Sequence, residues 1–81
     1  MNAAPMQAFA YWMEAAREDL ALSYLYETPA NRAAPLRRCM ACVALALGAA
    51  NALRDQPRRA LCLRILTWVR AALARLSPSA L

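Results

Sequence analysis

Apolar side chains recur every three or four residues in the first third of the chain. This spacing places them along one side of an α-helix, which we expect over about residues 5–26. The predicted core side of that helix carries Met6, Phe9, Met13, Ala16, Leu20 and either Ser23 or Tyr24. A second apolar side carries Tyr11, Ala15, Leu22 and Tyr26, with Leu25 close to it. The first predicted helix therefore has two apolar faces.

The middle of the chain contains an uncharged run from Cys39 to Leu53. It predicts a helix over about residues 34–54. At ~1.5 Å per residue the run is ~22 Å long, shorter than the ~30 Å hydrocarbon core of a bilayer, so we interpret the helix as the buried centre of the fold and not as a membrane span. We also expect a neighbouring helix to approach its side of small residues closely. That side consists of Ala41, Ala44, Gly48 and Ala52.

The last third repeats the helical pattern with a wider apolar side. Asp55 is a suitable N-cap and Pro57 falls in the first turn, so we expect a helix over about residues 56–76. Arginines border the apolar side, and Trp68 lies at one of its margins. The side consists of Leu61, Cys62, Ile65, Leu66, Trp68, Val69, Ala72, Leu73 and Leu76. Residues 77–81 are expected to form a frayed tail.

The residue types indicate the fold class. A single Gly and few β-branched residues argue against strands, and the prolines fall where helices begin or end. The sequence therefore predicts one all-α domain over residues 1–81. It is either a three-helix antiparallel bundle or a helical hairpin plus one helix.

The apolar content exceeds what so short a chain buries easily. Hydrophobic residues make up 62% of the 81 residues, against about 45–50% in an average protein, and a domain of this size buries only about 60% of its surface. We expect the surplus to contact a partner chain, either another protein or a second copy in a homodimer. The predicted contact residues are Tyr11, Leu22, Tyr26 and Trp68.

The charge leaves another partner class open. The formal net charge is +5, with arginine as the basic residue throughout and no His, a composition that suggests a GC-rich, bacterial genome. Acidic residues concentrate before Pro29 and arginines after it, which permits pairing within the chain. In a DNA-binding helix-turn-helix the Gly lies in the turn itself, whereas here the turn at residues 55–57 comes several residues after Gly48. The sequence therefore does not fit that motif. A binder of nucleic acid or of an anionic membrane surface stays an alternative. We favour both of these partners less than another protein chain.

The chain offers little for catalysis. It has no His and no glycine-rich phosphate loop, and we predict that it is not an enzyme and uses no cofactor. Cys39 and Cys42 have a Cys-x-x-Cys spacing, but with Cys62 they fall short of four zinc ligands, so we predict no metal site and interpret all three as core residues. Three cysteines and a start without a basic, apolar leader favour a cytoplasmic location.

A short segment resembles a known helical repeat. Leu47-Gly48, the turn Asp55-Gln56-Pro57 and the later Ala60 resemble one hairpin of the tetratricopeptide family. The segment departs from that pattern at Ala44, Asn51 and Arg64, where aromatic residues are common. Small chaperones of bacterial type III secretion are similar in size and built on such hairpins. The resemblance implies a cytoplasmic chaperone or adaptor for a partner protein; a small regulatory inhibitor would use the same kind of contact.

Overall fold

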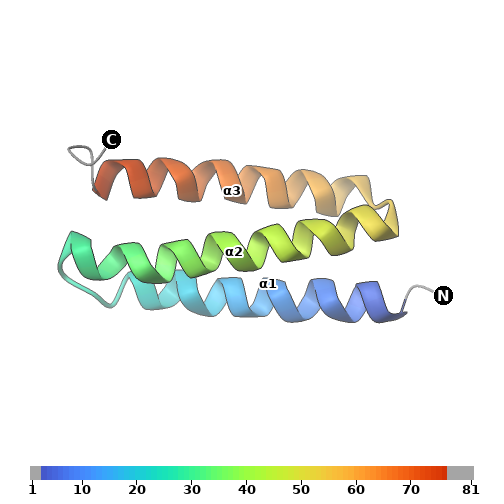
Figure 1. Ribbon diagram of the computed structural model, residues 1–81, viewed down its shortest axis with the longest axis horizontal. Coiled ribbons are helices and arrows are strands. Elements are labelled where there is room, and N and C mark those ends of the chain that lie inside the picture. The colour runs from blue at the N-terminus through green and yellow to red at the C-terminus, as the bar shows by residue number, and fades with distance from the viewer. Residues whose placement is uncertain (1–2, 77–81) are drawn as a thin grey trace.

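The protein consists of three α-helices joined by short turns. The computed structural model describes residues 3–76, and within them the elements are α1 (Ala3–Ser23), α2 (Pro29–Leu53) and α3 (Gln56–Leu76), with no strand. Successive helices run in opposite directions (Figure 1). The predicted all-α class and the three-helix antiparallel bundle are confirmed. The tail predicted to fray, residues 77–81, lies outside the described residues.

The central helix begins earlier than the sequence pattern suggested. It starts at Pro29 and not at about Ala34, because Thr28 provides an N-cap in which its side-chain oxygen accepts a hydrogen bond from the Asn31 N–H at 3.4 Å. Pro29 then occupies the first turn, where a missing N–H costs nothing. Pro35, expected to border the loop, instead lies inside α2 and is buried.

The turn between α2 and α3 is fixed by a backbone cap at the end of α2 and a side-chain cap at the start of α3. Arg54 ends α2 in the left-handed region (φ 54°, ψ 39°), and its N–H donates to the Asn51 carbonyl at 3.1 Å. Asp55 caps α3 as predicted, since its carboxylate accepts the Arg58 N–H at 3.0 Å and forms an ion pair with the Arg58 guanidinium. These bonds lower the pKa of Asp55.

The Asp55→Ala variant is expected to melt at a lower temperature than the wild type, because the Arg58 N–H in the first turn of α3 has no partner within the helix and is satisfied by the Asp55 side chain. The effect should depend on pH. The folded-state pKa is depressed, so the cap stabilises the fold above the unfolded pKa and loses this contribution as pH falls through the folded pKa. Thermal melts followed by circular dichroism check both points. Asp55→Asn, which keeps an acceptor, should melt above Asp55→Ala; equal melting would contradict the cap.

The core lies where α2 packs against its two neighbours. Val43 and Val69 are fully buried, and the core cluster draws residues from all three helices. An ion pair between Arg38 Nε and Asp19 Oδ1, 3.2 Å apart, also joins α2 to α1. The helices α1 and α3 each pack along α2 but make few contacts with each other. The centre of the fold is therefore α2, as expected.

The side of small residues on α2 faces outward, contrary to expectation. Ala41, Ala44, Gly48 and Ala52 are all exposed, and a Cβ added at Gly48 would have no atom within 4 Å. The reason is that α2 meets both neighbours through the side that carries Leu36, Cys39, Val43 and Ala46, which are buried. The predicted close approach of a helix to this small side is wrong for the described residues.

The same central helix is long and apolar enough to cross a membrane by length and composition. Its most apolar window has a mean hydropathy of 1.3, and 33% of that window is buried within the bundle. A helix at the centre of a bundle meets the same criteria.

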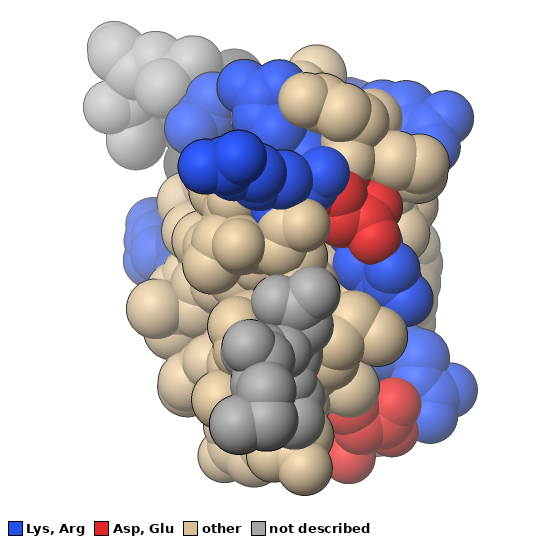
Figure 2. Space-filling view, turned by 90° about the vertical axis from the view of Figure 1, so that its right-hand side faces the viewer, with Lys and Arg blue, Asp and Glu red and all other residues tan. Residues whose placement is uncertain are grey.

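Charge is divided between the outer helices. α3 carries five arginines and no acidic residue, whereas α1 carries Glu14, Glu18 and Asp19 against Arg17. Figure 2 shows the end of the bundle where α2 meets α3, with most of the blue side chains gathered over the upper part, on the α3 side. The molecule thus presents a basic edge along α3.

A candidate helix-binding groove

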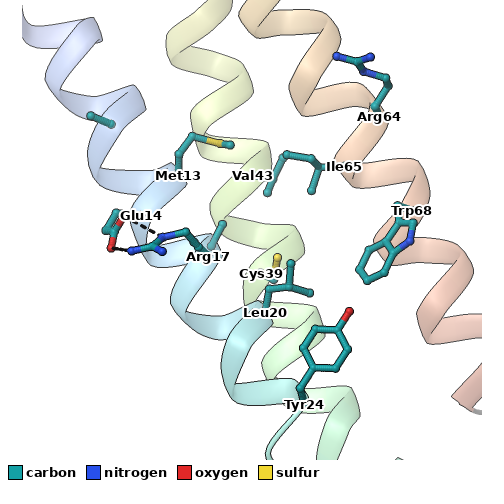
Figure 3. Close-up of a pocket in the computed structure, with 12 residues that line it drawn as sticks. Met13, Glu14, Arg17, Leu20, Tyr24, Cys39, Val43, Arg64, Ile65 and Trp68 are labelled. Atoms are coloured by element: carbon teal, nitrogen blue, oxygen red, sulfur yellow. Dashed lines mark hydrogen bonds and ion pairs between the residues drawn. The ribbon is translucent and has the colours of Figure 1, made fainter.

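An open cavity of about 720 Å³ lies between α1 and α3, with α2 as its floor. Figure 3 shows side chains from all three helices pointing toward it. Its lining is mostly apolar, with charged groups contributed by one pair on α1 and one arginine on α3. The lining residues are Ala10, Met13, Glu14, Ala16, Arg17, Leu20, Tyr24, Cys39, Val43, Arg64, Ile65 and Trp68.

Helical periodicity brings each wall of the groove together. Met13, Arg17 and Leu20 are spaced by three or four residues and so lie on one side of α1, as do Ile65 and Trp68 on α3. The floor is Cys39 and Val43, both buried. The groove exists because α1 and α3 both pack on α2 and do not close over it.

Two aromatic side chains face each other across the groove. Tyr24 stands just beyond the end of α1, and Trp68 lies on α3; Figure 3 shows their rings pointing toward one another. Both are exposed, Tyr24 to 66% and Trp68 to 44%. They also line a second cavity of about 200 Å³, which therefore adjoins the first at these two rings, and the two adjoining cavities together make up the groove. The rest of the second lining is Ser23, Arg32, Leu36, Ala72, Arg75 and Leu76.

The charged groups along this groove are mostly arginines. Glu14 is paired with Arg17 at 2.7 Å, and the guanidinium lowers the pKa of that carboxyl. Arg32 donates through Nε to the Tyr26 carbonyl at 2.7 Å. Within residues 3–76, Arg64 and Arg75 form no ion pair. The α3 wall therefore presents positive charge that a ligand can meet.

The structure brings one of the four predicted contact residues into the groove, Trp68. Tyr11 is 65% exposed on another side of α1, where its ring meets Trp12 edge-on at 4.8 Å between centroids. Leu22 is half-buried, and Tyr26 lies in the turn before α2. These three side chains do not line the groove.

Other groove residues were missed because the sequence pattern assigned them elsewhere. Met13 and Leu20 follow the core spacing of α1, and Tyr24 was an alternative end to the same stripe. They do pack against the core, but on the margin that opens toward α3. The available signal was the width of the apolar side of α3, which exceeds what α2 alone covers.

The three cysteines are free thiols whose pKa values are raised. All three are free; Cys39 and Cys62 are buried and Cys42 is half-buried. Burial is the main cause that raises the pKa of the Cys39 thiol to about 11, and it also raises the pKa values of Cys42 and Cys62. Raised pKa values oppose the thiolate that metal binding or nucleophilic attack needs. In the described part of the chain no three His, Cys, Asp or Glu residues gather as a metal site would.

Comparisons with protein-family models, with curated proteins and with solved structures found no match. The resemblance to a tetratricopeptide hairpin therefore stays a prediction. In the bundle, Gly48 and Ala60 both lie on exposed surface.

Proposed function

We propose that this protein is a non-enzymatic binding module that holds an apolar helix of a partner protein in the groove between α1 and α3. The observation that carries the proposal is the groove itself. It is open and mostly apolar, is lined by all three helices, and has two exposed aromatic rings across it. Aromatic side chains on an open apolar groove are typical of helix recognition.

The dimensions of the bundle suit a fourth helix. The second-longest extent is 21 Å and runs from α1 to α3 in Figure 1. Each helix axis lies about 2.3 Å inside its outermost Cα atoms, so the 21 Å extent is reduced by about 4.6 Å. The axes of α1 and α3 are therefore at most about 16 Å apart. Helices on the diagonal of a four-helix bundle with neighbours about 10 Å apart are about 14 Å apart. The spacing of α1 and α3 is therefore compatible with diagonal corners of such a bundle, with the groove as its open corner.

The cellular role we propose is that of a small cytoplasmic chaperone or adaptor. An apolar helix bound in the groove is shielded from water, which is what a chaperone for an aggregation-prone subunit provides. The free thiols agree with a reducing compartment. The resemblance to type III secretion chaperones suggests the same role, and a regulatory inhibitor would use the same groove.

A second candidate is binding to nucleic acid or to an anionic membrane surface. It is favoured by the five arginines of α3, which has no acidic residue. Salt separates the two candidates, because binding through phosphates weakens steeply between low and moderate salt, whereas apolar docking persists.

The Trp68→Asp variant is expected to lose the partner that the wild-type protein captures, because the carboxylate would enter an apolar groove. Leu63→Asp is the matched control. Leu63 is 40% exposed and Trp68 44%, and both lie on α3, but Leu63 does not line the groove. Affinity capture from the native host, at low and at moderate salt, compares the three proteins.

Equal loss in both variants, or capture that disappears at moderate salt in the wild type, would contradict helix binding in the groove. Sizing of the purified chain adds a further check. A dimer that Trp68→Asp dissociates would show that a second copy fills the groove and would replace the hetero-partner by a homodimer.

A further inference from the structure

We infer that the helix that occupies the groove is acidic along the border that faces α3. The inference rests on the proposed function and adds the chemistry of the partner. It comes from the charged side chains around the groove, which are mostly arginines and only partly paired.

The unpaired charge on the groove is positive. The two cavities are lined by four arginines and one carboxylate, and that carboxylate, Glu14, is already paired with Arg17. Arg64 and Arg75 form no ion pair within residues 3–76. A ligand with carboxylates at matching positions gains these two pairs, whereas a basic ligand meets like charge.

The spacing of Arg64 and Arg75 predicts where the carboxylates of the bound helix lie. Arg64, Trp68 and Arg75 are separated by four and then seven residues, so all three lie on nearly the same side of α3. At about 1.5 Å per residue, Arg64 and Arg75 are about 16 Å apart along the helix. The occupant therefore carries two acidic residues about three turns apart, with a large apolar side chain between them opposite Trp68.

The direction of the occupant follows from the topology. α1 and α3 run in the same direction (Figure 1), so a helix that completes an up-and-down bundle runs antiparallel to both. Its first turn then lies near Arg75, at the end of α3. An acidic residue in that first turn is favoured twice, by Arg75 and by the dipole of its own helix.

A second copy of this chain is a poor match for the groove. The chain has a net charge of +5, and α2 and α3 carry no acidic residue. In α1, Glu14 and Asp19 are already paired within the same chain. Of the acidic residues of α1, this leaves Glu18 without an ion pair within residues 3–76, whereas the groove offers two arginines. The charges therefore favour a partner that is a different, acidic chain.

Three synthetic peptides of about 20 residues test the inference. They share one apolar stripe and differ only in the two border positions, which are Glu, Gln or Lys. Fluorescence anisotropy of labelled peptide measures binding to the full chain. We expect the Glu peptide to bind about tenfold more tightly than the Gln peptide and the Lys peptide to bind more weakly than both.

Charge reversal on the protein provides the matched control. The double variant Arg64→Glu/Arg75→Glu is expected to reverse the order and prefer the Lys peptide. The double variant Arg59→Glu/Arg70→Glu changes the same charge on α3 at exposed arginines that do not line the groove, and it should keep the wild-type order.

The outcomes separate the inference from the proposed function. If the three peptides bind equally, or if both double variants change the order alike, the acidic partner is wrong while helix binding stands. If none binds below about 1 mM, the groove does not take a helix and both proposals fail. If sedimentation shows a dimer that the peptides do not dissociate, a second copy fills the groove and the acidic partner is again wrong.

Discussion

The Val43→Asp variant is expected to be largely unfolded at neutral pH and room temperature. Val43 is fully buried in the core cluster where the three helices meet. The substitution removes about 1.5–3 kcal/mol of apolar burial and leaves an uncompensated charge that costs about 3–5 kcal/mol more. A domain of this size has a total stability of only about 4–12 kcal/mol, at 0.05–0.15 kcal/mol per residue. Far-UV circular dichroism and urea titration measure the loss.

The next residue supplies the control. Ala44 is exposed on the outer side of α2, so Ala44→Asp should keep the helical signal and a cooperative transition. Acid should partly restore Val43→Asp, because a carboxyl buried in the core has a raised pKa and its charge penalty disappears as pH falls below about 4. A Val43→Asp protein that unfolds as cooperatively as Ala44→Asp at neutral pH would contradict the position of the core.

The contrast between Val43 and Ala44 shows what periodicity predicts well. The three- and four-residue spacing of Leu36, Met40, Val43 and Leu47 predicts a large-residue side of α2, and that side is the core side. It also gave three helices and the Asp55 cap, because these depend on residues adjacent in sequence. Such local signals are sufficient for the fold class and for most of the core.

The helix packing could not be predicted from the same pattern. An apolar side shows that a helix buries a surface but not which neighbour covers it, and so Met13 and Leu20 could be assigned to the core but not to the margin of a groove. The small side of α2 was expected to pack against a helix and faces outward, because α1 and α3 both use the opposite side. The groove exists because α1 and α3 make few contacts with each other. The apolar pattern of a single helix does not show which other helices it contacts.

The cysteines should differ greatly in their rate of alkylation in the folded protein. At pH 8, a Cys39 thiol with a pKa of about 11 forms about a hundredfold less thiolate than a thiol at the ordinary value of 9.0. Cys39 is also only 1% exposed and Cys62 is fully buried, whereas Cys42 is half-buried. We therefore expect iodoacetamide to modify Cys42 first and to modify Cys39 and Cys62 much more slowly in the folded protein.

Peptide mass spectrometry after timed alkylation, with and without urea, measures the three rates separately. In urea the rates should converge, because unfolding removes the burial that raises each pKa. Rising pH should speed alkylation of Cys39 in the folded protein up to about pH 11, where the thiolate fraction levels off. If Cys39 and Cys42 react at the same rate in the folded protein, then either Cys39 is not on the floor of the groove or the groove admits the reagent. The rate of Cys39 therefore also reports on the occupant, since a helix bound over that floor should slow it further.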